Sequence, residues 1–501
     1  MLKPKRIVIL GGGTAGWMAA NLMQARWQTR GFSIALVEAP DIGIIGVGEG
    51  STPTLKRFFT SLDIPESEWM PRCHATYKVN IRFQGWSPAS GQDSYSHPFI
   101  SQLDTFTENA FLVNCTTRRL GLAVETQPHK FLLNGQLAQE GKAPLVPAHF
   151  PFRMEYGYHF DSGLLGEFLA ERACALGVER IKAKVTSAEL NGAGEITQLV
   201  CEERAPIEGD FFIDCSGFNG VLIQQTLGVK FEPFSQLLND SAVVLPTPVN
   251  GNLPVETLSK AQSNGWRWQI PLTHRYGNGY VFSSQFQSAD AAETELRREL
   301  GLLNSDVAAR HLKMRVGQVE QHWVKNCLAI GLAQGFIEPL EATALHLVQI
   351  ALEMFMDEWE AGEFTPTKRD SYNQHIRERF ARVRDYIIAH YKLNTRDDSD
   401  YWRANRNNRE LPESLLQILD VWYRCGDLGQ ELQRQQIQQH FSNLSWHCLL
   451  SGYGVFPALA ANQPGRGDLF IEQSVQEYLA RCALNFPRQS EALASLLKQS
   501  K

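Results

Sequence analysis

The stretch Arg6-Ile-Val-Ile-Leu-Gly-Gly-Gly-Thr-Ala-Gly16 decides how the first part of the chain folds. A short apolar run is followed at once by a Gly-x-Gly-x-x-Gly pattern and then, from Trp17, by helical spacing. This order is typical of a pyrophosphate bound at the N-terminus of a helix. The first glycine allows a tight turn, the second a close approach of the backbone to phosphate, and the third close packing of helix on strand.

An acidic residue stands where this fold places the partner of a ribose. Glu38 closes the next apolar run, Ile34 to Val37. Its distance from the glycines is that expected for a carboxylate that binds a ribose 2′-hydroxyl. The two signals together predict a dinucleotide-binding βαβ unit and leave open which dinucleotide it binds.

Length and charge narrow the classes of partner. A chain of 501 residues can form two or three domains, or one domain with a large appendage. The net charge is −6, from 54 acidic and 48 basic residues, which gives no electrostatic argument for binding nucleic acid or an anionic membrane. We therefore expect small-molecule partners.

The cysteines and the N-terminus indicate a compartment. The 9 cysteines are scattered, odd in number and never spaced as Cys-x-x-Cys, which argues against a disulfide framework or a structural zinc site. The apolar run near the N-terminus is too short for a signal peptide, and no later segment is long enough to span a bilayer. We expect a cytoplasmic protein without a resident metal.

The remaining pattern predicts a discontinuous fold. Residues 76–83 alternate as a strand with Lys78 on its polar face, whereas residues 87–155 read as an irregular insertion. Asp161 is a plausible helix cap, and a long helix follows Pro339. We expect one module over residues 1–365 and a mainly helical portion over residues 366–501.

Three groups of residues could carry chemistry, although each has an ordinary structural explanation. A lysine on a polar strand face is usually solvated, and Glu341, in the predicted first turn of a helix, is favoured there by the helix dipole. An aromatic run that ends in proline, such as Trp266-Arg-Trp-Gln-Ile-Pro271, is more often a core strand. Their combination is more informative than any one of them.

That combination resembles the flavin-dependent halogenases, the family that includes the tryptophan halogenases. The resemblance is carried by the N-terminal glycine pattern, by Trp266-x-Trp268-x-Ile270-Pro271, and by Pro339-Leu-Glu-Ala-Thr343. It covers roughly the first 390 residues. It implies an α/β fold, with a Rossmann-like FAD-binding domain of the flavin monooxygenase/halogenase type and a mainly helical C-terminal portion.

The resemblance also implies a reaction. Reduced FAD, supplied by a separate flavin reductase, and oxygen convert chloride or bromide to hypohalous acid, which passes to a lysine. Lys78 would hold and polarise the halogen, and Glu341 would orient the oxidant and accept the proton that leaves the ring. Thr343 and the backbone N–H of Ala344 would bind halide. The motif Trp266, Trp268, Ile270 and Pro271 would keep substrate away from the flavin.

Cofactor and substrate contacts follow residue by residue from the same resemblance. The FAD contacts fall on Gly11, Gly13, Thr14, Ala15, Gly16, Glu38, Ala39, Val47, Val185, Asp214, Leu332 and Leu345. His97, Phe99 and Trp446 match the residues that sandwich an indole ring. The stretch 444–454 lacks the tyrosine pair and the glutamate that clamp free tryptophan, so we expect indole or another electron-rich aromatic as substrate.

Two other hypotheses remain. The chain could be a single-component FAD monooxygenase that hydroxylates an aromatic compound. This hypothesis explains the glycine turn and Glu38, but it assigns no function to Lys78 and the tryptophan motif. A non-catalytic flavin-binding redox sensor would use the C-terminal helices to bind a protein partner.

Overall fold

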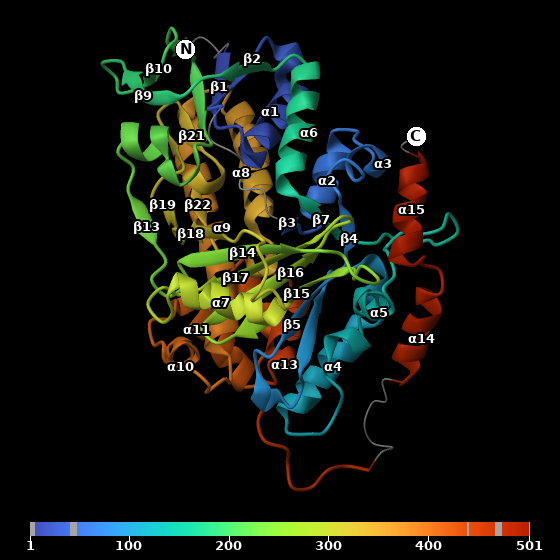
Figure 1. The fold of residues 1–501 in the computed structure, drawn as a ribbon. Helices are drawn as coiled ribbons and strands as arrows, with labels where there is room; N and C mark the ends of the chain where they lie inside the picture. The colour runs from blue at the N-terminus through green and yellow to red at the C-terminus, as the bar shows by residue number, and fades with distance from the viewer. Residues whose placement is uncertain (1–5, 41–47, 438–439, 466–472, 500–501) are drawn as a thin grey trace. The chain divides into compact units, whose positions relative to one another are not determined.

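The computed structural model describes residues 6–40, 48–437, 440–465 and 473–499, in two compact units that interleave along the chain (Figure 1). Unit 1 consists of Met1–His74, Phe160–Phe234 and Arg315–Ala381, and unit 2 of Ala75–His159, Ser235–Met314 and Arg382–Lys501. The expected boundary at residue 365 lies inside unit 1. No helix in the described ranges is both long and apolar enough to cross a membrane.

Unit 1 is built on a mainly parallel sheet. The strand order is β20-β21-β12-β1-β2-β8, and every neighbouring pair is parallel except β20–β21. The bounds are β1 (Arg6–Leu10), β2 (Ser33–Glu38), β8 (Glu179–Lys182), β12 (Phe211–Asp214), β20 (Trp323–Val324) and β21 (Cys327–Ala329). The central β1 is an apolar run because it is buried on both faces. The Rossmann-like prediction is confirmed.

Helices cover this sheet. Figure 1 shows α1 (Thr14–Trp27) beside α6 (Ser162–Ala175), and α1 also packs against α8 (Ala344–Ala361). The predicted cap is confirmed, since the Asp161 carboxylate accepts from the N–H groups of Gly163 and Leu164 at 3.1 and 3.2 Å. The other elements are α2 (Thr54–Ser61), α3 (Glu66–Trp69), β3 (Gly48–Gly50), and two small sheets formed by β9 (Val185–Leu190), β10 (Ile196–Cys201) and β11 (Ile207–Glu208), and by β13 (Phe231–Pro233), β19 (Gly317–Val319) and β22 (Gly335–Phe336).

Unit 2 is built on a seven-stranded sheet of order β18-β14-β17-β16-β15-β5-β6. Its neighbours are antiparallel except β15 and β5, which run parallel. The bounds are β5 (Asn80–Gln84), β6 (Ser94–Pro98), β14 (Ser241–Thr247), β15 (Glu256–Gln262), β16 (Gly265–Pro271), β17 (Tyr276–Phe282) and β18 (Arg310–Lys313). A short strand, β4 (Thr76–Lys78), pairs antiparallel with β7 (Gly157–Asp161).

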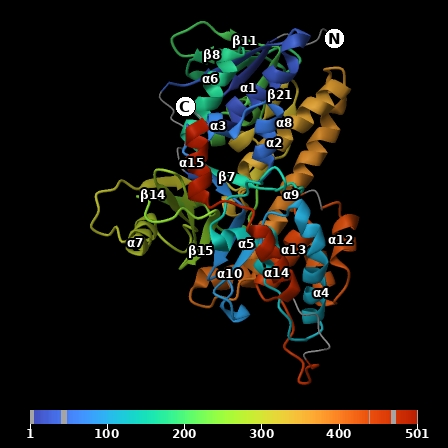
Figure 2. The ribbon, with the colours of Figure 1, turned by 90° about the vertical axis from the view of Figure 1, so that its right-hand side faces the viewer.

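Unit 2 also contains many helices, which Figure 2 shows. They are α4 (Glu108–Arg119), α5 (Leu133–Glu140), α7 (Ala289–Leu300), α10 (Asp400–Asn407), α11 (Glu413–Tyr423), α12 (Leu428–Arg434), α13 (Asn443–Gly452), α14 (Gln473–Ala483) and α15 (Gln489–Gln499). The long α9 (Arg369–Lys392) begins in unit 1 and ends in unit 2. The described residues after Ala344 contain no strand, which agrees with the helical C-terminal portion expected.

The stretch 87–155 is more regular than expected. It contains β6, which forms one edge of the seven-stranded sheet, and the helices α4 and α5. Polar residues interrupt the apolar spacing of both helices, which hides their period in the sequence.

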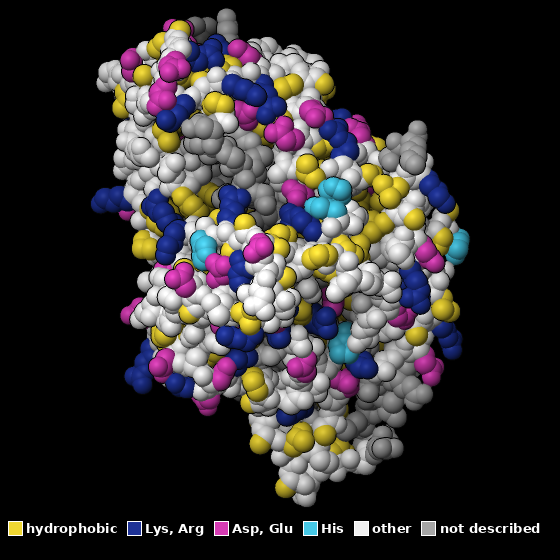
Figure 3. Space-filling model, viewed as in Figure 1, with side chains coloured by type: hydrophobic (Ala, Val, Ile, Leu, Met, Phe, Trp, Pro, Cys, Tyr) yellow, Lys and Arg dark blue, Asp and Glu magenta, His cyan; other side chains and the backbone are white. Residues whose placement is uncertain are grey.

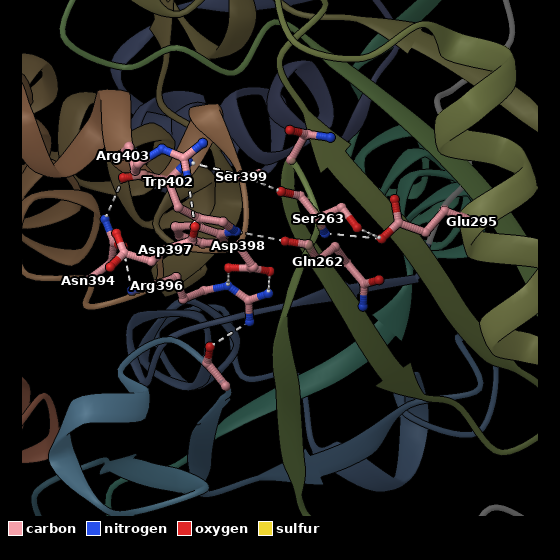
Figure 4. A network of polar contacts seen from close by, with 12 residues as sticks. Gln262, Ser263, Glu295, Asn394, Arg396, Asp397, Asp398, Ser399, Trp402 and Arg403 are labelled. Atoms are coloured by element: carbon pink, nitrogen blue, oxygen red, sulfur yellow. Dashed lines mark hydrogen bonds and ion pairs between the residues drawn. The ribbon is translucent and has the colours of Figure 1, made fainter.

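A polar network fixes the turn between β15 and β16 (Figure 4). The indole N–H of Trp402 donates to the Gln262 carbonyl at 2.8 Å, and the Ser399 hydroxyl donates to the Ser263 carbonyl at 2.6 Å. The Ser263 hydroxyl donates in turn to Glu295 of α7 at 2.7 Å. The turn that leads into β16 is therefore held by helices on either side of it.

The face shown in Figure 3 carries intermixed charges. Lysine and arginine side chains alternate over it with aspartate and glutamate side chains. All 9 cysteines are free, as expected from their spacing.

The three glycines of the Gly-x-Gly-x-x-Gly pattern do not all have the same structural role. Gly11 has φ +121°, and a Cβ on it would lie 2.1 Å from the Cys215 carbonyl oxygen. A Cβ on Gly16 would lie 2.0 Å from the Gly11 carbonyl oxygen. A Cβ on Gly13 would meet no atom within 4 Å, and Gly13 caps α1 with φ −76°. Gly11 and Gly16 are therefore required by the protein itself, whereas Gly13 leaves open space at the helix N-terminus.

This difference predicts opposite outcomes for two alanine substitutions. Gly16→Ala should lower the free energy of unfolding by at least about 1–3 kcal/mol, because backbone must move to admit the methyl group. Gly13→Ala should leave the melting temperature of the cofactor-free protein unchanged and weaken dinucleotide binding, because the methyl group occupies the space that a pyrophosphate needs. Thermal melting and a dinucleotide titration measure both effects. Equal melting temperatures for the two variants would contradict this assignment.

Candidate active site

The residues around the glycine turn fit a dinucleotide. The N-cap Gly13 has no side chain with which to cap α1, and a Cβ on it would meet no atom within 4 Å, so the first turn of α1 begins beside open space. Glu38 accepts from Arg180 Nε at 2.6 Å, and its other carboxylate oxygen lies over Gly12, where a Cβ would be 1.9 Å from it. Arg180 also lies over the Trp17 ring, 5.3 Å from its centroid. The Glu38 carboxylate, which the sequence predicts to bind a ribose, is thereby held in one orientation.

Several other predicted FAD contacts lie near this turn. Ala15 approaches Gly331, since a Cβ on Gly331 would lie 2.9 Å from the Ala15 Cβ. That contact brings the short turn η7 (Gly331–Ala333), which includes Leu332, to the start of α1. Leu345 lies in the first turn of α8, which packs against η7. Thr14 donates to the Ser162 carbonyl at 3.3 Å.

The remaining predicted FAD contacts are more scattered. Val185 begins β9 and packs on the core of unit 1, and Ala39 directly follows β2. Val47 lies outside the described residues. Glu49, just after it, is half-buried, and burial raises its pKa to about 7, against a hydrogen bond from Ser162 that lowers it.

Asp214 holds the chain turn that follows β12. Its carboxylate is fully buried and accepts from Ser216 N (3.0 Å), Ser216 Oγ (2.6 Å), Leu222 N (2.9 Å) and Ile223 N (2.8 Å). A carboxylate has about four acceptor sites, so these bonds occupy it. Burial raises the pKa of Asp214, and the four bonds oppose that rise. The structure thus gives Asp214 a role in shaping the turn beside Gly11.

The predicted halide site lies at the N-terminus of a long helix, but Glu341 does not lie in that helix. Glu341 ends the 3₁₀ turn η8 (Pro339–Glu341), and Ala342 has φ +56°, so the chain turns before α8 begins at Ala344. The prediction that Glu341 lies in the first helical turn is wrong for this reason.

Thr343 and Ala344 occupy that position instead. Thr343 is the N-cap residue of α8, it is 3% exposed, and its hydroxyl has no hydrogen-bond partner among the described residues. Glu341 is buried as well, at 3% exposure. A buried hydroxyl beside the N–H groups of a helix start is suited to an anion.

Lys78 is buried, contrary to the solvated strand face expected for it. Its side chain is 0% exposed, and so are its neighbours Tyr77 and Val79. β4 ends at Lys78 after three residues, and the chain there is covered on both faces, which the alternating pattern does not reveal. Lys78 Nζ lies 5.4 Å from the centroid of the Phe99 ring. The structure thus brings Lys78 and the predicted substrate residue Phe99 together.

The tryptophan motif forms β16, and its partner strand supplies glycines. Trp268 stands opposite Gly279 and Ile270 opposite Gly277 in the β16–β17 register. A Cβ on Gly279 would lie 2.0 Å from the Trp268 ring, so the indole lies flat on the neighbouring backbone. Trp266 and Trp268 are buried, with ring centroids 6.0 Å apart.

Two further predicted substrate residues meet at a tyrosine that the sequence did not indicate. The rings of His97 and Trp446 lie 5.9 and 4.8 Å from the ring of Tyr386. Trp446 is fully buried in α13. Tyr386 lies in α9, where its aromatic side chain is indistinguishable in sequence from any other buried helix position.

Sequence reasoning also missed the strand that accompanies Lys78. The sequence predicted a helix cap at Asp161 but no strand before it, yet β7 pairs with β4 and places His159 opposite Thr76. The alternation of Tyr158 and Phe160 with His159 was a signal that could have identified it.

The Trp268–Gly279 contact predicts that Gly279→Ala destabilises unit 2 by about 1–3 kcal/mol, because the methyl group overlaps the indole. Trp268→Phe removes the overlapping ring, so Gly279→Ala should cost less in that background. Gly192→Ala, whose Cβ meets no atom within 4 Å, is the matched control. Urea unfolding of the four variants and the parent measures the coupling, and strict additivity would contradict the contact.

Comparisons with known proteins agree with this geometry. A family model described as tryptophan halogenase matches residues 6–464. The tryptophan 6-halogenase SttH of Streptomyces toxytricini is 37% identical over 442 residues, which cover 84% of each chain.

Solved structures give the same result. Xcc4156, a flavin-dependent halogenase from Xanthomonas campestris, is similar with a TM-score of 0.83 at 33% identity, over 99% of this chain and 98% of its own. BrvH, a flavin-dependent halogenase from Brevundimonas sp. BAL3, has a TM-score of 0.83 at 32% identity over 99% of each chain. The chain belongs to the tryptophan halogenase family of flavin-dependent halogenases, oxidoreductases that use reduced FAD and halide.

Proposed function

We propose that this enzyme halogenates an indole ring through an electrophilic halogen held by Lys78. The residues that we assign to FAD and halide belong mainly to unit 1, whereas Lys78 and the aromatic residues that we assign to substrate belong to unit 2. When bound, reduced FAD with oxygen supplies the oxidising power that turns chloride or bromide into hypohalous acid. A separate flavin reductase provides the reduced FAD.

The observation that carries the proposal is the complete burial of Lys78. Removing a lysine side chain from water is costly, so a fully buried lysine in a small strand is a candidate for a functional role. An ammonium donates hydrogen bonds to hypohalous acid. After the ammonium has lost a proton, the neutral amine can attack the halogen of hypohalous acid, which gives a haloamine and water. Phe99, whose ring faces Nζ, is placed to hold an aromatic substrate near the halogen.

Glu341 and Thr343 complete the proposed chemistry. The Glu341 carboxylate is assigned the proton that leaves the ring after the halogen has been added. The Thr343 hydroxyl and the Ala344 N–H are assigned to halide, because both lie at the start of α8. The tryptophans of β16 are assigned to keeping substrate from the flavin.

Indole, rather than free tryptophan, is the substrate we propose. The stretch 444–454 contains no carboxylate and a single tyrosine, Tyr453, so it lacks the groups that would bind an amino acid's charged ends. Its one ionisable imidazole, His447, is buried, and burial lowers its pKa to about 4. Relatives such as SttH are named for tryptophan, so the assay must include both compounds.

Lys78→Met tests the central assignment. The variant keeps an apolar chain of similar length, and we expect halogenated product to fall about a hundredfold or more while oxidation of reduced FAD continues. The assay supplies FAD, flavin reductase, NADH, oxygen and bromide with either indole or L-tryptophan, and mass spectrometry identifies the product.

Lys313→Met, in exposed β18 at an edge of the seven-stranded sheet, is the control and should keep full activity. Unchanged halogenation by Lys78→Met, or a hydroxylated product from the parent enzyme, would overturn the assignment. A clear preference for L-tryptophan over indole would overturn only the substrate proposal.

Thr343→Val tests the halide site. Loss of the hydroxyl should raise the halide KM about tenfold or more, because a hydrogen bond to an anion is lost without a change in shape. FAD affinity should stay the same, and Thr343→Ser should restore the parent halide KM. A halide KM in Thr343→Val equal to that of the parent would place the halide elsewhere.

A further inference from the structure

A buried hydrogen-bonded chain links the strand that carries Lys78 to the last residue of the tryptophan motif. Thr76 Oγ1 donates to the Pro271 carbonyl at 2.8 Å and lies 3.1 Å from His159 Nδ1. His159 Nε2 lies 2.9 Å from Thr257 Oγ1. Thr76 and His159 are fully buried, and Thr257 is 9% exposed. All four residues belong to unit 2.

The donors and acceptors in this chain can be assigned from one fixed end. A proline carbonyl only accepts, so the single hydroxyl proton of Thr76 is directed to Pro271. The contact between Thr76 and His159 then requires His159 Nδ1–H to be the donor. In a neutral imidazole the other nitrogen accepts, so Thr257 donates to His159 Nε2.

Electrostatics agrees with a neutral imidazole. Burial lowers the pKa of His159 well below its ordinary value, and the positive charge of Lys78 lowers it further. His159 therefore adds no second positive charge beside Lys78.

These hydrogen bonds hold β4, the strand that carries Lys78. Thr76 and Lys78 are two residues apart on β4, so their side chains leave the strand on the same face. Pro271 ends β16, and Thr257 lies on β15, the strand between β16 and β5. His159 itself lies on β7, so the four residues join four strands.

We propose that His159, as the Nδ1–H tautomer, is a positioning residue that sets the place of Lys78 relative to the tryptophan motif. The proposal rests on the proposed role of Lys78 in halogenation. His159 does not touch the reacting atoms; it holds Thr76, and through Thr76 the short β4. A shift of about 1 Å in a reacting group can cost about a hundredfold in rate, so small movements of β4 affect halogen transfer.

Two amide substitutions separate the two nitrogens. His159→Asn places an amide N–H near the Nδ1 position and can still donate to Thr76. His159→Gln places its amide near the Nε2 position and loses that donor. We expect His159→Asn to keep most of the halogenated product per reduced FAD oxidised, and His159→Gln to lose about tenfold or more.

The positioning role has a readout that general instability would not produce. A small 1,3-diketone that traps free hypohalous acid should be halogenated by His159→Gln as fast as by the parent, with unchanged FAD affinity. Thr76→Val, which keeps the shape and removes the hydroxyl, should reproduce the His159→Gln result. Equal product yields from His159→Gln and the parent, or a His159→Asn variant as poor as His159→Gln, would overturn the proposal.

A measurement on the parent protein tests the chain independently of halogenation. Nitrogen-15 NMR of labelled histidine, with the His159 signals assigned by their absence in His159→Asn, reports which ring nitrogen carries the proton. We expect a protonated Nδ1 and an unprotonated Nε2. A protonated Nε2 with a bare Nδ1 would refute the chain even if the enzyme is a halogenase, whereas an active Lys78→Met variant would refute only the halogenation role.

Discussion

A lysine buried at the end of a three-residue strand is the constraint around which unit 2 is arranged. Such a side chain is tolerated only where its surroundings are fixed, because water cannot compensate for movement. Phe99 presents its ring to Nζ, and the neutral His159 holds the adjoining Thr76. The strand β16, which carries the tryptophans, is fixed as well. Trp268 lies flat on Gly279, and Trp402 and Ser399 hold the turn that leads into β16.

Two helix N-termini of unit 1 have the same physical property. The N-terminus of α1 faces open space at Gly13, and the N-terminus of α8 presents the buried Thr343 hydroxyl. Both ends offer N–H groups and a favourable dipole to an anion. We propose that this anion is a pyrophosphate in the first case and a halide in the second. The turn after β12, held by the Asp214 carboxylate, supports the first of these sites.

The sequence predicted the features that depend on local rules. The glycine turn, the parallel strands around it and the Asp161 cap each follow from a few neighbouring residues, and the structure contains all of them. Features set by distant parts of the chain were not predictable in this way. Lys78 reads as a surface residue because its covering comes from other segments, and Glu341 leaves the helix because of the single turn at Ala342.

The site residues show the same division. The resemblance predicted roles for Lys78, Thr343 and the tryptophans from short motifs, but nothing in those motifs indicated Gly279, Tyr386 or His159. Gly279 matters through strand register, and His159 through a hydrogen bond between β7 and β4. Both relations join positions far apart in the chain, which a single sequence read along its length does not connect.

We propose above all that this protein transfers a halogen, rather than oxygen, to an aromatic ring. The most direct test is a single turnover in which the enzyme is mixed with chemically reduced FAD, oxygen, bromide and indole, without a reductase, and the product mass is measured. We expect bromoindole, recognised by its paired bromine isotopes. An oxygenated indole without bromine would contradict it.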